Sequence, residues 1–274
     1  PTPAPAVRSS ADVLAQLDGA MEDLDRHPLS AREELSRLLL EGELAPADAA
    51  LVRDALTALN QQLVFGMRFI DGDPFVESYR IQSGDALSRL PGRRGWRVGW
   101  RLIADISGIP DPARLQVGQT VKGLRGPFHA VVTKRSYRMD IWMGDLSAAP
   151  VYVRSFNVGL GSDDRTPVGR WEVLSKDVNP SWRNPETGES FSRDDPENPI
   201  GERWIGIRGI DPANRDMLGF GIHGTIDDDS IGRDESMGCV RLRHDDIVQL
   251  YDLLQDESLI VIRTREDEPL RLQR

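Results

Sequence analysis

Two residues of this chain, Cys239 and His223, have the types and the spacing from which a nucleophilic site could be built. Cys239 is the only cysteine among 274 residues and follows Ser236-Met237-Gly238, sixteen positions after His223. A single thiol cannot form an internal disulfide, and a cysteine among small residues with a histidine upstream is typical of a nucleophile. His223 and Arg241 could lower the thiol pKa from its ordinary value of about 8.5. A small buried hydrophobic residue is the alternative interpretation of a lone cysteine.

Sulfur attack on an amide carbonyl requires a deprotonated thiol, an acid for the leaving amine and donors for the oxyanion. We predict Cys239 as the nucleophile and His223 as the base that later protonates the amine. Gly238 lets the chain turn, so that its N–H and that of Cys239 can point at the oxyanion. Arg241 offers a cation for the thiolate or for a substrate carboxylate. Ser236 either orients this loop through hydrogen bonds or only forms a turn.

The surrounding segments resemble one known family. His223-Gly224-Thr225, followed by the Ser-x-Gly-Cys-Val-Arg-Leu run from Ser236, is similar to the signature of the L,D-transpeptidase (YkuD) catalytic domain. Thr166-Pro167-Val168-Gly169 resembles the entry to one of its strands, and 199–206 resembles the segment before the histidine. Many members carry histidine where this chain has Met237, so we expect no catalytic role at that position.

The resemblance implies a reaction, a substrate and further site residues. It implies a two-step acyl transfer on peptidoglycan stem peptides, with a thioester on the cysteine, release of a D-amino acid and formation of a cross-link. It assigns the carbonyl of Gly224 as the group that orients His223. The large aromatic side chains that could line the peptide groove, with burial in the core as the alternative for each, are Trp182, Trp204 and Tyr251.

Other functions stay open at this point. The thioester could be resolved by water, which gives L,D-carboxypeptidase activity, or the chain could be a non-catalytic peptidoglycan-binding protein. We predict no cofactor and no metal site. The run Asp227-Asp228-Asp229 lacks the glycine and glutamate of a calcium loop, and His223, Cys239 and His244 lack the paired spacing of zinc ligands.

Composition and the implied function limit the partners and the cellular compartment that we expect. A net charge of −10 and a pI near 5.0 argue against nucleic-acid binding. No apolar run approaches the roughly 20 residues of a membrane span, and no secretory segment is present. From the implied function we expect an extracytoplasmic protein, in the periplasm or the cell wall, with any targeting segment upstream of Pro1.

The pattern along the chain predicts a multi-domain protein. We expect a linker at 1–10, a helical segment at 11–70, a small βααβ domain at 76–123, a mainly-β catalytic domain of sandwich or barrel-like form at 126–265, and a C-terminal tail at 266–274. In the helical segment, Ser30 and Glu33 resemble a capping box, and Pro46 fits the first turn of a third helix. We expect these helices to pack on the rest of the chain rather than to bind a separate partner.

The segment at 76–123 resembles a LysM domain, a fold in which two strands enclose two helices. Tyr79-Arg80-Ile81-Gln82-Ser83-Gly84-Asp85 fits its opening, and Leu115-Gln116-Val117-Gly118-Gln119 fits its close. The resemblance implies binding of a peptidoglycan glycan; a spacer that keeps the fold without the ligand is the alternative. Beyond it, short β-branched or aromatic runs predict strands at 128–133, 138–143, 151–156, 170–174 and 259–262, with one helix at 246–254.

Overall fold

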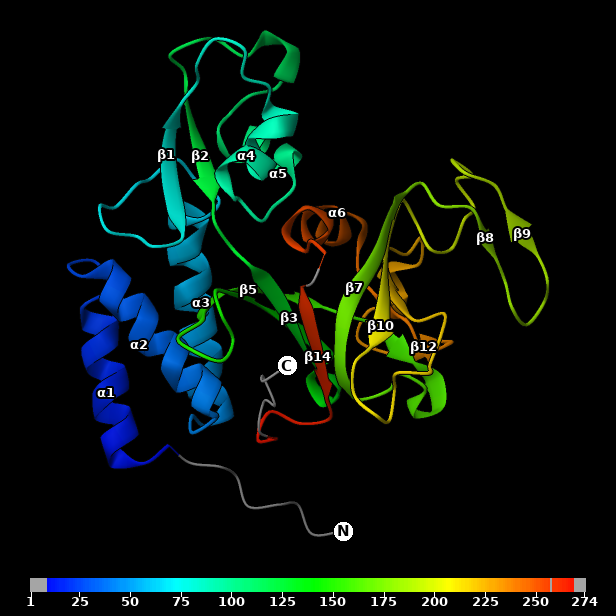
Figure 1. Cartoon of the computed structure of the whole chain (residues 1–274). Helices are drawn as coiled ribbons and strands as arrows, with labels where there is room; N and C mark the ends of the chain where they lie inside the picture. The colour runs from blue at the N-terminus through cyan, green and yellow to red at the C-terminus, as the bar shows by residue number, and fades with distance from the viewer. Residues whose placement is uncertain (1–8, 257, 269–274) are drawn as a thin grey trace.

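The computed structural model describes residues 9–256 and 258–268, so 1–8 of the expected linker and 269–274 of the expected tail lie outside the described residues (Figure 1). Three helices open this part of the chain: α1 (Ala11–Glu22), α2 (Pro28–Glu41) and α3 (Pro46–Leu63). The predicted start of α3 at Pro46 is confirmed. The capping box is wrong, because α2 begins at Pro28 and Ser30 lies inside its first turn, where its hydroxyl donates to the His27 carbonyl. None of the described helices has the length and apolarity to cross a membrane.

The helices cover the edge and one face of a sheet. The N–H of Tyr152 on edge strand β5 (Val151–Asn157) donates to the Ser36 hydroxyl at 3.0 Å, and the Tyr152 carbonyl accepts from the Asn60 amide at 2.7 Å. These contacts satisfy backbone groups that an edge strand otherwise exposes. Leucines of α2 and α3 share an apolar cluster with Val131 and Trp142 of the sheet. The helical segment therefore packs on the rest of the chain, as expected.

A small unit with two strands and two helices follows. It contains β1 (Val76–Arg80), the short helices α4 (Leu90–Arg94) and α5 (Trp100–Ile106), and β2 (Thr120–Leu124). The strands pair antiparallel, with Val76 opposite Leu124. Trp96 packs against the sheet at Gly123, where any Cβ would lie 2.0 Å from the indole ring. The described chain thus contains a β-α-α-β arrangement between 76 and 124.

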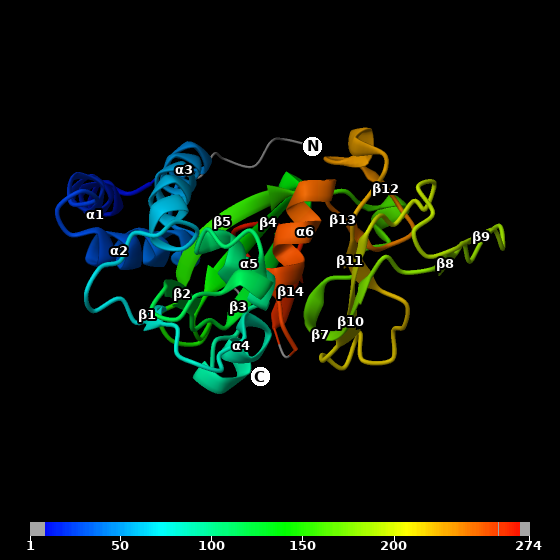
Figure 2. The same cartoon turned by 90° about the horizontal axis from the view of Figure 1, so that it is seen from above.

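One curled, mixed sheet of eight strands forms the remainder, in the order β13-β11-β10-β7-β14-β3-β4-β5 (Figures 1 and 2). The mainly-β prediction is confirmed, and the strands form a single sheet rather than two packed sheets. Helix α6 (His244–Leu253) lies across the face opposite α1–α3 (Figure 2). Besides β5, the strands of the sheet are β3 (Phe128–Thr133), β4 (Arg138–Met143), β7 (Gly169–Val178), β10 (Arg203–Gly209), β11 (Gly221–His223), β13 (Val240–Arg241) and β14 (Leu259–Arg263).

Two further strand pairs lie next to the sheet. Strand β6 (Leu160–Gly161) pairs in parallel with β12 (Asp234–Ser236), which brings Gly161 beside Ser236. Strands β8 (Trp182–Arg183) and β9 (Ser190–Phe191) form a hairpin that extends away from the body of the molecule (Figure 1). Both pairs join the end of the sheet that carries β11 and β13.

Candidate active site

The register of two short strands brings the predicted chemistry together. β11 and β13 are parallel neighbours, with Ile222 opposite Val240 and His223 opposite Arg241. Ile222 and Val240 point into the core, where both are buried. Because side chains alternate along a strand, Cys239, His223 and Arg241 share the other face. One ladder of two residue pairs therefore places the thiol, the imidazole and the guanidinium on the same side of the sheet.

That face opens into a cavity of about 320 Å³. Its walls come from the β8–β9 hairpin, the segment before β10, the turn between β10 and β11, and the cysteine loop. Of the residues that the structure describes, Arg241 is the only charged one that lines it, although the chain as a whole carries −10. The lining residues are Trp182, Pro185, Pro199, Ile200, Trp204, Leu218, Gly219, Phe220, His223, Ser236, Met237, Cys239 and Arg241.

The imidazole of His223 is held in one orientation. Its Nδ1 lies 2.6 Å from the carbonyl oxygen of Gly224. A carbonyl only accepts, so Nδ1 carries the proton and Nε2 is the basic nitrogen. The indole of Trp204 stacks on the imidazole, with centroids 5.7 Å apart and planes at 16°. Burial lowers the pKa of His223 to about 4; the Gly224 carbonyl opposes this shift, and Arg241 adds to it. His223 is therefore neutral at pH 7.

Cys239 is partly exposed at the cavity wall. Its Sγ lies 3.7 Å from the Gly219 carbonyl oxygen, to which the thiol donates. Burial raises the pKa of Cys239; a backbone hydrogen bond from Gly221 and the charge of Arg241 lower it by less. The resting site thus holds a neutral thiol and a neutral imidazole rather than a thiolate–imidazolium pair. Such a site transfers the proton only as the thiol attacks.

Arg241 forms no ion pair within the described residues, and its buried Nε lacks a hydrogen-bond partner there. Most buried guanidinium groups in proteins are paired, because an uncompensated buried charge is costly. Arg241 is a cation left available on the wall of an otherwise uncharged cavity. It is suited to a ligand carboxylate.

The loop before Cys239 is held by one hydroxyl. Ser236 Oγ donates to the Cys239 carbonyl at 2.6 Å and accepts the N–H of Gly238 at 3.0 Å. Ser236 thus orients the loop through hydrogen bonds. The expectation that the Gly238 N–H faces an oxyanion is wrong for this structure, because Ser236 already accepts that hydrogen. Gly238 is needed for shape: its φ is +131°, and a Cβ would lie 2.9 Å from the Arg165 carbonyl oxygen.

A residue that the sequence did not single out supports this loop from behind. Lys134 is buried, and its ammonium donates to the carbonyl of Thr166 at 2.5 Å and to the carbonyl of Asp164 at 3.5 Å, and pairs with the Asp164 carboxylate. These contacts hold loop 162–166, which lies against Gly238. Thr166 in turn accepts the N–H of Gly161 at 2.8 Å. No local motif marks Lys134, because its partners are about thirty positions away.

The three aromatic residues predicted for the peptide groove do not all lie at this cavity. Trp182 and Trp204 line the cavity, and Trp182 also stacks on Phe191 across the β8–β9 hairpin. Tyr251 is not among the residues that line it. It lies on α6 beside α5, where the ammonium of Lys176 sits 4.2 Å from its ring centroid. The period of α6 directs Tyr251 toward that junction, whereas the cavity is formed by strand ends and loops.

No group of three or more potential metal-ligating side chains occurs within residues 9–256 and 258–268. His244 instead lies 4.0 Å from Glu202, with both side chains more than half exposed. Asp227 accepts hydrogen bonds from its own turn, including the N–H of Asp229 at 3.1 Å. The chemistry available in the cavity is that of a thiol, an imidazole and a guanidinium.

Comparisons with known proteins agree with this site. Residues 127–262 match the family described as the L,D-transpeptidase catalytic domain (YkuD). YqjB of Bacillus subtilis, which carries an L,D-transpeptidase name, is 32% identical over 140 residues, covering 51% of this chain and 73% of that protein. ErfK/SrfK of Escherichia coli, also named as an L,D-transpeptidase, is 34% identical over 192 residues, covering 65% of this chain and 55% of that protein. The chain belongs to the L,D-transpeptidase (YkuD) family.

Solved structures of L,D-transpeptidases are also similar to part of this chain. L,D-transpeptidase 3 of Mycobacterium tuberculosis, in complex with a faropenem-derived adduct, covers 55% of this chain and 76% of its own, at 13% identity and a TM-score of 0.39. An L,D-transpeptidase of Mycobacterium smegmatis covers 69% and 91%, at 12% identity and a TM-score of 0.40.

Proposed function

We propose that this protein cross-links peptidoglycan as an L,D-transpeptidase, with Cys239 as the nucleophile and His223 as the base. The observation that carries the proposal is the β11–β13 register, which sets both side chains and Arg241 on one face of a cavity. The catalytic domain corresponds to 126–265. Membership of the YkuD family supports the same reaction class.

The first half-reaction forms a thioester. Sγ of Cys239 attacks the carbonyl carbon of the donor peptide while Nε2 of His223 takes the thiol proton. The Gly224 carbonyl stabilises the imidazolium through Nδ1–H, and the N–H of Cys239 is the oxyanion donor that this loop retains. When the tetrahedral intermediate collapses, the C–N bond breaks and His223 gives its proton to the departing amine. A D-amino acid leaves, and the acyl group stays on sulfur.

The second half-reaction restores the thiol. An acceptor amine attacks the thioester carbon, His223 removes a proton from that amine, and the C–S bond breaks as sulfur is reprotonated. The low pKa of His223, about 4, keeps Nε2 free to accept a proton at neutral pH in both halves. Water in place of the amine would give L,D-carboxypeptidase activity, which is the second outcome open to the same thioester.

The cavity supports a substrate that carries a carboxylate. Arg241 is its single charge and has no acidic partner in the described chain. Trp182 of the β8–β9 hairpin and Trp204 of β10 supply apolar surface to its walls. A stem peptide combines these properties, because its backbone is flanked by carboxylates. We assign the carboxylate of the donor peptide to Arg241 and the peptide chain to the two indoles.

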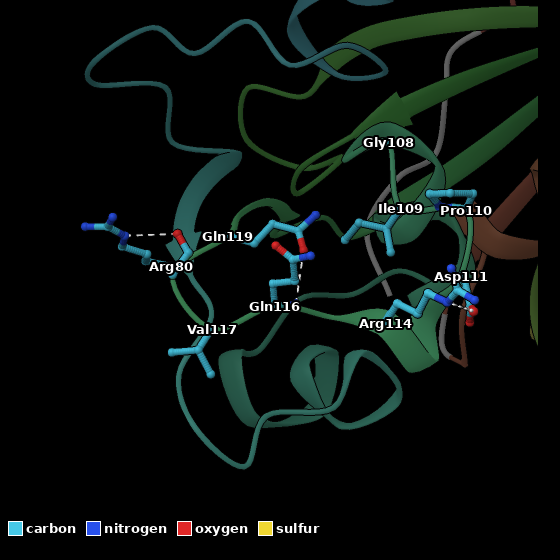
Figure 3. A pocket seen from close by; sticks show the side chains of 10 residues that line it. Arg80, Gly108, Ile109, Pro110, Asp111, Arg114, Gln116, Val117 and Gln119 are labelled. Carbon is cyan, nitrogen blue, oxygen red and sulfur yellow. Dashed lines mark hydrogen bonds and ion pairs between the residues drawn. The ribbon is translucent and has the colours of Figure 1, made fainter.

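The βααβ unit at 76–123 supports a second, finer proposal: a LysM-like domain that holds the glycan. A cavity of about 620 Å³ lies between the end of β1 and the segment that joins α5 to β2 (Figure 3). Polar groups line it, among them Arg80, which donates to the Gly118 carbonyl at 3.0 Å, and the side chain of Gln119, whose Oε1 accepts the backbone N–H of Gln116 at 3.3 Å. A spacer without ligand is the alternative. Sedimentation with purified peptidoglycan, with and without Gln119→Ala, separates the two.

A substrate in the cell wall places the protein outside the cytoplasm, in the periplasm or the wall, and we propose that location. Peptidoglycan is the partner in both the catalytic and the LysM-like proposals. Nucleic acid is not, given the net charge of −10.

Incubation with a tetrapeptide donor and a labelled amine acceptor, followed by mass spectrometry of the products, tests the reaction. Transpeptidation predicts a cross-linked dimer, hydrolysis predicts tripeptide and free D-amino acid, and both disappear in Cys239→Ser. A folded Cys239→Ser variant that keeps the native turnover would refute the nucleophile. A native protein that binds peptidoglycan and turns over neither way would favour the non-catalytic alternative.

A further inference from the structure

A third cavity, lined by a cluster of arginines, lies where helices α2 and α3 meet the sheet. It measures about 500 Å³ and shares no lining residue with the cavity at Cys239. One wall is aliphatic, with Leu39 of α2, Ala49 of α3 and Leu44 of the loop that joins them. The opposite wall comes from the turn between β3 and β4 and from the end of β14. We call it the arginine cavity; its cationic lining residues are Arg53, Arg135, Arg138, Arg263 and Arg265.

The buried and half-buried side chains around this cavity carry more positive than negative charge. Two carboxylates, Asp140 and Glu266, face three guanidinium groups there. Arg138 donates to Asp140 at 2.8 Å and also pairs with Glu266. Arg53 lies 3.5 Å from Asp140 and 3.4 Å from Glu266. Both carboxylates are thus shared by Arg53 and Arg138, and the third guanidinium, Arg263, is left over.

Arg263 makes contacts only with neutral groups in the described chain. Its Nε donates to the Thr133 hydroxyl at 3.1 Å, and its Nη1 donates to the carbonyls of Glu266 at 2.8 Å and Glu268 at 3.1 Å. Within the same ranges no carboxylate lies within ion-pair distance of it. Burial lowers the pKa of Arg263; the charges of Asp140 and Glu266 oppose this shift, and those of Arg138 and Arg53 add to it. Because three guanidinium groups share the charge of two carboxylates here, an added anion would stabilise the cluster.

We propose that the arginine cavity binds a small amphiphilic monoanion, with its carboxylate or phosphate on Arg263 and its apolar part against the aliphatic wall of α2 and α3. The charge left over at Arg263 supplies the first half of this recognition, and Leu39, Leu44 and Ala49 supply the second. The planar guanidinium suits an oxyanion, because its N–H groups match the spacing of two oxygens. The site lies outside the catalytic machinery, so the ligand is not the stem peptide held at Cys239.

Octanoate, octanol and acetate distinguish the two halves of the proposal in the native protein. We expect saturable calorimetric binding of octanoate, at least tenfold weaker binding of octanol, which lacks the charge, and equally weak binding of acetate, which lacks the chain. Amide NMR shifts on adding octanoate should fall at Gly42 and Ala50 of the cavity and not at His223. Equal binding of octanol, shifts only at His223, or no saturation by octanoate would each overturn the proposal.

Substitutions then test whether Arg263 binds the anion. Arg263→Gln should weaken octanoate binding at least tenfold, whereas Arg208→Gln, an exposed arginine paired with Glu172 on the sheet, should leave it within twofold. Ala50→Trp, at the exposed rim of the cavity, should also abolish binding without changing any charge. Circular dichroism checks that each variant is folded. Undiminished octanoate binding by folded Arg263→Gln contradicts the assignment to Arg263.

Discussion

The low pKa of His223 predicts how the folding stability of the protein depends on pH. Burial lowers this pKa to about 4, whereas an exposed histidine in the unfolded chain titrates near 6.5. The unfolded state therefore binds a proton first as the pH falls. A depressed folded pKa gives stability that is fully present above pH 6.5 and is lost progressively between pH 6.5 and pH 4. A difference of roughly 2.5 pKa units corresponds to about 3 kcal/mol in total, of which about 2.5 kcal/mol is lost by pH 4.5.

Urea unfolding of the native protein and of His223→Asn, at pH 7.5 and at pH 4.5, isolates this contribution. Carboxylates titrate over the same range, but they do so in both proteins and cancel in the difference. We expect the native protein to lose about 2.5 kcal/mol more than His223→Asn between the two pH values. Parallel losses in the two proteins would show that His223 is not buried as a neutral group, and would refute the derivation of its protonation state.

Three further predictions concern the surroundings of Cys239, each read as the rate of acylation by a carbapenem. Lys134→Met removes the ammonium that holds loop 162–166 and should slow acylation at least tenfold. The matched variant Lys176→Met also leaves buried carbonyls without a donor, but beneath α6, and its acylation rate should stay within threefold of the native rate. Equal effects of the two variants would exclude a positioning role for Lys134. Gly238→Ala forces a Cβ to 2.9 Å from the Arg165 carbonyl oxygen and should reduce acylation at least a hundredfold, so near-native rates would contradict the loop geometry. Trp204→Ala should slow acylation about tenfold, because the indole no longer stacks on His223, whereas Tyr251→Ala should not change the rate. A larger effect of Tyr251→Ala than of Trp204→Ala would place Tyr251, rather than Trp204, in the peptide groove.

The parts of the fold that were predictable depend on local pattern. The runs at 128–133 and 138–143 became β3 and β4 because the strand preference of β-branched and aromatic residues requires no long-range information. Pro46 likewise marked the start of α3. Ser30 misled because Pro28, two residues earlier, already supplies the φ of a first helical turn and begins α2 there.

The site was predictable in its residues but not in its arrangement. Cys239, His223 and Arg241 follow from residue type and spacing, and the structure brings all three to one cavity. The direction of an N–H does not follow from sequence, so the capture of the Gly238 hydrogen by Ser236 was missed. Strand order is equally hidden, because β11 and β13 become neighbours through a parallel pairing that no local signal encodes.

Intact-protein mass spectrometry after incubation with a carbapenem tests the central assignment most directly, because the chain has one cysteine. The account predicts a single adduct with the full mass of the carbapenem on the native protein, at a rate that falls at least a hundredfold in folded His223→Ala, and no adduct on Cys239→Ala. An adduct of the same mass that persists in Cys239→Ala, or a rate unchanged by His223→Ala, would contradict it.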